Sequence, residues 1–280
     1  MKYAHMRRRI VNIVMFAGTA LCALLAVSVL LLILSYLLWN GARSLNWSFF
    51  TQLPAPPGES GGGMANAIIG SVELLGVATL LALPVGFLAG IYVAEYGSAG
   101  MGFAVRYTSD LLNGVPSIVL GIVAYALVVI PMGHFSVLAG GAALSIIFLP
   151  IAIRTTEQFL RAVPLSLREG ALALGATKWR AMATVVIPAA LRGIAAGMIL
   201  ALARIAGETA PLLFTSFSNR YWSTSLTQPI ASLPVMIFNY AISPYDDWHR
   251  QAWAAGLILL ALILGVNVLA RVVLAPKAVA

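Results

Sequence analysis

The sequence predicts an all-α membrane protein with six transmembrane helices. Of its 280 residues, 61% are hydrophobic and 9% are charged, whereas a soluble domain carries about 25% charged residues. Long uncharged stretches alternate with short segments that hold most of the lysines and arginines. The net charge of +8 does not indicate nucleic-acid binding, because the basic residues flank apolar spans and do not alternate with aromatic residues on a polar domain.

The first span is predicted over residues 10–39, which contain no charged residue. Lys2 and the arginines at 7–9 precede it, a pattern that a secretory signal also shows. The apolar stretch of about 30 residues exceeds a signal's apolar region of about 7 to 15, so we expect an uncleaved helix with a cytoplasmic amino terminus. Residues 43–65 follow as an exterior loop rich in proline and glycine. Cys22, the one cysteine, is expected to face lipid or to pack, and it excludes an internal disulfide.

Further apolar stretches predict five more spans, at residues 67–94, 110–130, 136–153, 193–215 and 252–274. The second of the six contains Glu73 and Pro84, and the third contains Pro116. The fourth has about 18 residues, which is near the minimum length for crossing a bilayer.

The distribution of basic residues predicts the orientation of these spans. Of the 17 lysines and arginines, only Arg43, Arg220 and Arg250 fall outside, and Arg204 lies within a span. The remainder flank the spans on the inner side. Because cytoplasmic loops carry the excess of positive charge, both termini are expected in the cytoplasm.

The long outer loop at residues 216–251 contains an apolar patch at 233–242. The patch is too short to span a bilayer, so it should be re-entrant or lie on the surface. The neighbouring residues 245–248 are candidate contacts for an external partner, or they belong to a solvated loop.

The segment at residues 154–192 is a basic, hydrophilic loop between the fourth and fifth spans. Its first half predicts a short helix, with Ser166 as N-cap, Glu169 completing a capping box and Gly175 as the C-terminal stop. One face of this helix is apolar and carries Leu167, Ala171 and Leu174. Such a face can dock into a groove of a partner, or it can lie on the membrane surface.

A second short helix is expected at residues 177–186. Lys178 and Arg180 lie in its first turn, and Pro188 limits its extension. The two short helices are therefore joined at Gly175.

The loop resembles the EAA loop of bacterial ABC importer permeases, whose pattern is Glu-Ala-Ala, three residues, glycine, nine residues and Ile-x-Leu-Pro. Glu169, Ala171, Gly175 and Pro188 match this pattern, whereas Gly170 replaces the first alanine. In that family the loop docks into a cytoplasmic ATPase. The resemblance therefore implies that coupling to an ATPase depends on Ser166, Leu167, Glu169, Ala171, Leu174 and Gly175.

Arg204 and Glu208 are charged residues within the predicted fifth span. A charge near the bilayer centre costs at least about 2.5 to 3.5 kcal/mol, so both side chains should face protein or water. As an i, i+4 pair they can neutralise one another, which would be a structural role. The alternative is a functional role in a substrate pathway, together with Thr209.

Several segments resemble the phosphate-specific transport permeases of the PstA family. They are ALARIAGETAPLLFT in the fifth span, NGVPSIVLGIVAYALVV at 113–129, the stretch 153–180 and the closing QAWAAGLILLALILGVNVLARVVL. The resemblance covers most of residues 66–274 and implies the type I ABC importer permease fold there, whereas residues 1–65 add one helix and a periplasmic loop. It also implies a permease subunit of an ATP-driven inorganic phosphate importer in the bacterial inner membrane. Permeases for sulfate or molybdate share the general design and are the alternative.

The resemblance also implies a set of partners. One coupling loop would engage one ATPase subunit, whereas hydrolysis in this class requires an ATPase dimer, so a second permease chain is implied. In the resembled family that chain is a homologous permease, and the dimeric cytoplasmic ATPase binds the ATP. An extracytoplasmic binding protein delivers phosphate. The sequence leaves open whether the two permease chains are identical.

Other function classes find no support in the residues. Histidines at 5, 134 and 249 are scattered over loops or termini, and no metal or catalytic motif is present. The spacing from Gly170 to Gly175 resembles a phosphate-binding loop, but Ala176 stands where lysine is obligatory. We therefore expect no enzyme, no cofactor and no bound metal in this chain. A non-transporting scaffold would be favoured only if Arg204 and Glu208 faced lipid.

Overall fold

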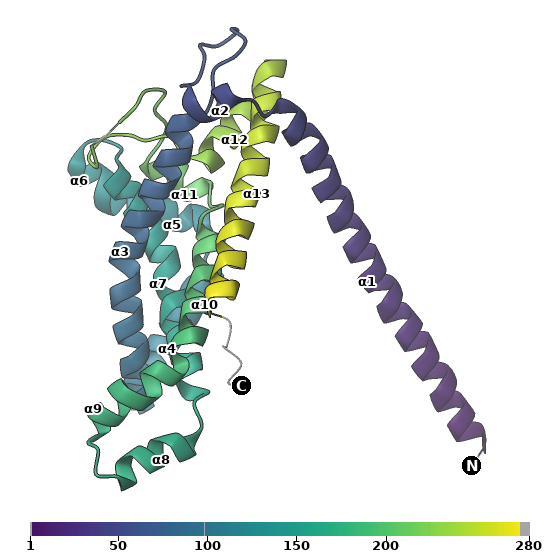
Figure 1. Ribbon diagram of the computed structural model, residues 1–280, viewed down its shortest axis with the longest axis vertical. Coiled ribbons are helices and arrows are strands. Elements are labelled where there is room, and N and C mark those ends of the chain that lie inside the picture. The colour runs from purple at the N-terminus through teal and green to yellow at the C-terminus, as the bar shows by residue number, and fades with distance from the viewer. Residues whose placement is uncertain (1, 98, 224, 275–280) are drawn as a thin grey trace.

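The computed structural model describes residues 2–97, 99–223 and 225–274, and within them every regular element is a helix. The long helices are α1 (Lys2–Ser44), α3 (Ala65–Glu95), α4 (Ala99–Gly114), α7 (Val137–Arg161), α10 (Ile187–Ile205) and α13 (Asp246–Leu274). The shorter helices are α2 (Trp47–Thr51), α5 (Ser117–Ala124), α6 (Ile130–Met132), α8 (Leu165–Ala173), α9 (Lys178–Ala181), α11 (Ala210–Thr215) and α12 (Leu233–Ala241). Two π-helical turns complete the set, η1 (Tyr125–Val129) and η2 (Met182–Val186). The expected all-α class is confirmed (Figure 1).

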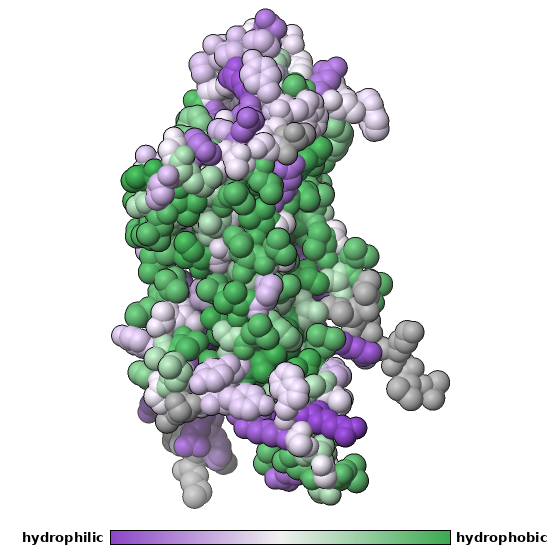
Figure 2. Space-filling view, turned by 90° about the vertical axis from the view of Figure 1, so that its left-hand side faces the viewer, coloured by the Kyte–Doolittle hydropathy of each residue, from purple (hydrophilic) through white to green (hydrophobic). Residues whose placement is uncertain are grey.

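Five of the described helical segments are long and apolar enough to cross a membrane, and a sixth span arises if one bent pair is counted as one. The bent pair joins Gly100–Gly114 to Ser117–Met132 at an angle of 104°. Figure 2 shows the matching surface, in which hydrophobic residues cover the middle of the molecule and hydrophilic residues gather at both ends. The expectation of one continuous third span at residues 110–130 is wrong, because the chain breaks at Pro116. Proline disfavours helical geometry in the residue before it and lacks an amide hydrogen.

The remaining span boundaries also shift. The fourth span is longer than the predicted 136–153, since α7 continues to Arg161. The sixth begins at Asp246, ahead of the predicted residue 252. The fifth is not continuous from 193 to 215, because α10 ends at Ile205 and α11 begins at Ala210. In contrast, Pro84 lies inside α3 without ending it.

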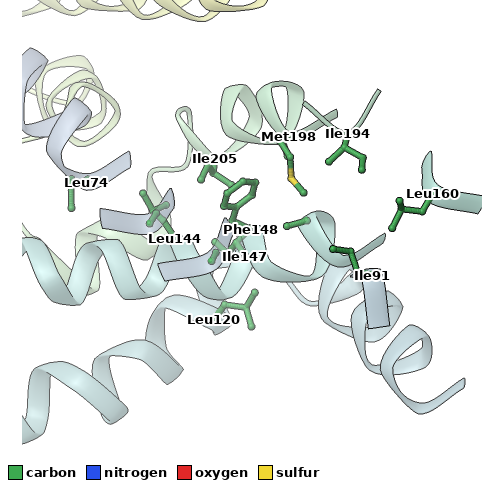
Figure 3. Packing of buried hydrophobic residues seen from close by; sticks show 14 of the residues in the cluster. Leu74, Ile91, Leu120, Leu144, Ile147, Phe148, Leu160, Ile194, Met198 and Ile205 are labelled. Atoms are coloured by element: carbon green, nitrogen blue, oxygen red, sulfur yellow. The ribbon is translucent and has the colours of Figure 1, made fainter. Parts of the chain in front are cut away.

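The centre of the bundle is the pair α3 and α7, and α10 packs on α7. Glycines bring α3 and α7 together: a Cβ added at Gly86 would lie 2.5 Å from the Cβ of Ala152, and one at Gly90 would lie 2.5 Å from the Cβ of Thr156. Small residues permit such close approach of membrane helices. Around this contact the fully buried Phe148 and its neighbours form the main hydrophobic core (Figure 3).

Helix α1 leans away from the rest of the bundle and contacts it at its upper end (Figure 1). There Gly41 lies against α13, where an added Cβ would come within 2.7 Å of the Cβ of Leu257. The rings of Tyr36 and Trp253 also meet edge to face at 5.2 Å. Below this contact the apolar side chains of α1 are exposed, and so is Cys22, as expected of a lipid-facing residue.

The apolar patch at residues 233–242 forms α12, which packs against α13 and α3. Leu233 and Val235 are fully buried, and Tyr240 stacks on Trp248 with ring centroids 4.2 Å apart. The patch therefore packs against two long helices through most of its apolar side chains, while Phe238 and Ile242 are exposed.

Candidate functional site

The loop between α7 and α10 is shorter than the predicted 154–192, because Arg161 still belongs to α7 and Ile187 already begins α10. What projects at the lower end of the molecule is the unit formed by α8 and α9 (Figure 1). No residue of α8 is buried. Exposed apolar side chains crowd this unit, and they are those of Leu165, Leu167, Leu172, Leu174 and Trp179. In Figure 2 hydrophobic side chains are visible at this end, below a band of hydrophilic ones.

The start of α8 differs from the expected capping box. Pro164 is the N-cap, no side chain caps the helix, and Ser166 lies inside it. Ser166 therefore cannot cap, and Glu169 has no N-cap partner. The reason is that Pro164 already supplies the extended backbone that the residue before a helix requires.

The end of α8 follows the prediction. Gly175 has a φ of +82°, a left-handed conformation that glycine adopts without strain. Its N–H donates to Leu172 O at 2.9 Å, and the N–H of Ala176 donates to Ala171 O at 3.1 Å. These two bonds are the Schellman motif, which satisfies the last carbonyls of a helix. Gly175 as the stop is confirmed, and this turn sets the direction of α9.

The second short helix does not end at Pro188. Thr177 caps α9 by accepting the N–H of Arg180 at 3.3 Å, and the helix then runs through η2 directly into α10. Pro188 occupies the first turn of α10. Proline is tolerated there because the N–H groups of a first turn have no acceptor within the helix. The wider π turn accommodates the proline, so α9, η2 and α10 form one helix over Lys178–Ile205.

Contacts from α8 and α9 converge on the lower end of α3. The guanidinium of Arg168 pairs with the carboxylate of Glu95 and also donates to Leu160 O, near the end of α7. Lys178 Nζ donates to Glu95 O at 2.6 Å and lies 4.6 Å from the ring centroid of Tyr96. Burial lowers the pKa of Arg168, but a guanidinium stays charged at neutral pH.

A cluster of charges that the sequence did not predict joins α4 to α7. The carboxylate of Glu157 is 2% exposed and bonds to Arg106 at 2.5 Å, to Arg154 at 3.0 Å and to Arg161 at 3.1 Å. Arg154 also pairs with Asp110 at 3.1 Å. A buried carboxylate is retained when such partners satisfy it. The close spacing of Arg154, Glu157 and Arg161 on one helix was the available signal, but Arg106 is distant in sequence.

Arg204 and Glu208 line one cavity of about 220 Å³, together with Leu112, Asn113, Val115, Pro116, Ser117, Leu120 and Ile147. Arg204 lies about 18 Å along the helix axis from the basic Arg192. Because a bilayer's hydrocarbon core is about 30 Å thick, Arg204 is expected at membrane depth. Within the described part of the chain, neither side chain forms an ion pair or a hydrogen bond. The structural alternative, an i, i+4 ion pair on a continuous helix, is therefore not what the described residues form.

The reason is that the helix ends between the two residues. Glu208 follows the break after Ile205, and Gly207 lies in this break. Pro211, in the first turn of α11, has no N–H to continue a helix from α10. Thr209 is the N-cap residue of α11 and makes no side-chain cap. It is not among the residues that line the cavity.

The second wall of this cavity is the break between α4 and α5, with Asn113 and Ser117 on either side of Pro116. The two broken helices pack together: a Cβ added at Gly121 of α5 would lie 2.6 Å from Pro211 Cα of α11. Interrupted membrane helices expose backbone and polar groups to a cavity, which is how transporter sites are commonly built. Arg204, Glu208, Asn113 and Ser117 thus form the candidate substrate site.

The sequence of this chain is similar to those of known membrane transport proteins. The family described as "Binding-protein-dependent transport system inner membrane component" matches residues 82–275. The phosphate transport system permease protein PstA of Yersinia pestis is 47% identical over 261 residues, covering 90% of this chain and 88% of that protein. A probable phosphate transport system permease protein PstA of Methanocaldococcus jannaschii is 36% identical over 210 residues, covering 75% of each chain.

Solved structures show the same fold at low identity. A bacterial alginate ABC transporter, in complex with a periplasmic protein that holds an alginate pentasaccharide, superposes with a TM-score of 0.63 at 16% identity. The match covers 89% of this chain and 91% of that one. The MetNI methionine ABC transporter in an inward-facing conformation gives a TM-score of 0.59 at 18% identity, over 76% of this chain and 93% of that one.

Proposed function

Because the chain belongs to the PstA family of phosphate transport permeases, within the binding-protein-dependent inner membrane components, we propose that it forms part of the phosphate path and couples it to ATP hydrolysis. The protein is a multi-pass inner-membrane permease of an ABC phosphate transport system, without an ATPase site of its own. An ATPase and a binding protein are therefore its partners.

The observation that supports the phosphate path is an unpaired arginine beside a cavity at membrane depth. Arg204 has no ion-pair partner within the described residues, and it lines the cavity between the two helix breaks. A guanidinium offers a planar fork of donors that matches an oxyanion, and its attraction to a doubly charged anion is stronger where the dielectric constant is low. Arg204 would bind the phosphate oxygens.

Glu208 would select among oxyanions. Its carboxylate can accept a hydrogen bond from the remaining proton of hydrogen phosphate, whereas sulfate at neutral pH has no such proton. An anion without a proton would meet an unpaired negative charge and be repelled. Thr209 follows Glu208 in the chain and belongs to the proposed pathway. There it would help to position Glu208.

The exposed apolar face of α8 supports the coupling role. Leu167 is 47% exposed, and Leu174, the C-cap residue that follows the helix, is 91% exposed. An apolar surface of this kind suits a groove in a partner. Ser166, Glu169, Ala171 and Gly175 complete the proposed docking unit. Glu169 is exposed, without an ion pair in the described part of the chain, and so is free to meet a basic residue of the ATPase.

A second homologous permease and a dimeric ATPase complete the proposed assembly. The exposed apolar length of α1, away from its own bundle, fits a chain that shares its membrane surface with another permease (Figure 1). The start of α1 and the unit of α8 and α9 lie at the same end of the molecule. Together with the concentration of basic residues there, this supports cytoplasmic termini. By the same proposal, residues 1–65 add a membrane helix and a periplasmic loop to a transport domain at 66–274.

The test is uptake of radiolabelled phosphate by liposomes that contain the complete complex, with its binding protein and ATP. Uptake should require ATP and should resist competition by equal concentrations of sulfate or molybdate. Stronger competition by either of these anions would identify it as the substrate. For coupling, Leu174→Asp should abolish co-purification of the ATPase, whereas the same change at the exposed Leu226, in the outer loop, should leave it intact.

A further inference from the structure

Helix α8 is held to the bundle through very few side chains. It has no buried residue, and only Arg168 among its side chains forms an ion pair within the described residues. The side chain of Arg168 is 19% exposed and that of Glu95 is 11% exposed, so the pair is partly shielded from water. Shielding matters because an exposed ion pair contributes little to protein stability. Losing one partner of a buried pair is strongly destabilising.

Arg168 joins the ends of two helices at once. Glu95 is the last residue of α3, and Leu160, whose carbonyl accepts from the same guanidinium, is in the last turn of α7. The last carbonyls of a helix have no partner within it and carry partial negative charge, which favours a cation at this position. One arginine of α8 therefore satisfies groups on both central helices.

The two helices that Arg168 joins pack closely against each other. Their backbones approach along Gly86 and Gly90, where added Cβ atoms would collide with α7. An interface packed this tightly resists gradual deformation. A displacement of α8 by a docked partner would pass through Arg168 into this pair of helices.

We propose that Arg168 is a positioning residue that transmits movement of the docked α8 to α3 and α7 through its pair with Glu95. The proposal rests on the function proposed above for α8. It assigns Arg168 no contact with the ATPase, because its guanidinium faces Glu95 while the apolar side chains of α8 face outward. Lys178 holds the backbone carbonyl of Glu95, so α9 should remain in place when either side chain of the pair is changed.

The first test compares ATP hydrolysis with and without phosphate-loaded binding protein in the reconstituted complex. In Arg168→Gln the stimulation should fall about fivefold or more, the lower bound of typical coupling between sites. The ATPase should still co-purify at its normal ratio. Arg168→Lys should retain most of the stimulation, and Arg192→Gln, a matched change at an exposed arginine with no described partner, should retain all of it.

The second test separates a mechanical link from a role in folding. Glu95→Cys combined with Arg168→Cys, in a Cys22→Ser background, should be unstimulated until a short bismaleimide joins the two thiols, and then regain stimulation. Normal stimulation in Arg168→Gln, loss of ATPase binding in that variant, or failure of the cross-link to restore stimulation would each overturn the proposal. If the wild-type complex itself is not stimulated by phosphate, the proposed function fails instead.

Discussion

Replacing the buried carboxylate of Glu157 by the isosteric amide of glutamine should destabilise the protein. Glu157 is 2% exposed and is bonded to three arginines at 2.5 to 3.1 Å. Removing one member of a buried ionic cluster costs about 3 to 5 kcal/mol, because the remaining charges lose their partner. Arg106 and Arg154 are 28% and 27% exposed and Arg161 is 52% exposed. Water can solvate these arginines in part once the carboxylate is lost. We therefore expect a loss of stability at the lower end of this range, about 3 kcal/mol.

The assay is reversible unfolding in mixed micelles with increasing SDS, followed by circular dichroism. The matched control is Arg161→Gln, which removes the most exposed partner and should cost less than about 1 kcal/mol. The reasoning is refuted if Glu157→Gln and Arg161→Gln unfold at the same SDS fraction, since the buried carboxylate would then contribute no more than a surface pair.

Three further results are expected. Gly90→Leu should destabilise the contact of α3 with α7 by about 1 to 3 kcal/mol in the same unfolding assay, through overpacking; unchanged unfolding would contradict the close approach. Gly175→Ala should cost about 1 kcal/mol locally, because alanine is strained at positive φ; phosphate-stimulated hydrolysis should fall, and full stimulation would show that the turn does not direct α9. In a cysteine-free background, Ser60→Cys should react with an impermeant thiol reagent added outside intact cells, and Ala173→Cys should react only after permeabilisation; the reverse pattern would invert the topology.

Much of the fold followed from local patterns. The lengths of apolar stretches predicted where helices cross the membrane, because about 20 apolar residues are needed to span it. Gly175 was predicted as a helix stop because the left-handed turn it makes is a local property. In both cases neighbouring residues determine the structure.

Prolines were less predictable because their effect depends on what surrounds them. Pro116 breaks a span by 104°, Pro84 lies inside α3, and Pro188 is accommodated by the adjacent π turn. A proline can end, kink or begin a helix, and packing decides between these outcomes. The break after Ile205 was missed for the same reason, so the expectation of one continuous fifth span was wrong.

Contacts between distant segments could not be predicted at all. Glu95 and Arg168 are 73 residues apart, and Arg106 and Glu157 are 51 apart. No spacing in the sequence indicates such pairs, because only the packing of separate helices brings them together. Asn113 and Ser117 were missed in the same way, since their cavity exists only where two helix breaks meet.

We propose that phosphate passes through the cavity beside Arg204 and Glu208. The most direct test is ATP-driven phosphate uptake by the reconstituted complex in Arg204→Ala, Glu208→Gln and the exchanged double variant Arg204→Glu with Glu208→Arg. We predict that Arg204→Ala lowers uptake at least about tenfold, since a charged hydrogen bond contributes about 1.5 to 3 kcal/mol. Glu208→Gln should weaken discrimination against sulfate, and the exchanged variant should stay inactive, while all variants co-purify with the ATPase. Restored uptake in the exchanged variant would show that the two charges serve only to balance one another, and it would contradict the assignment of the cavity as the phosphate path.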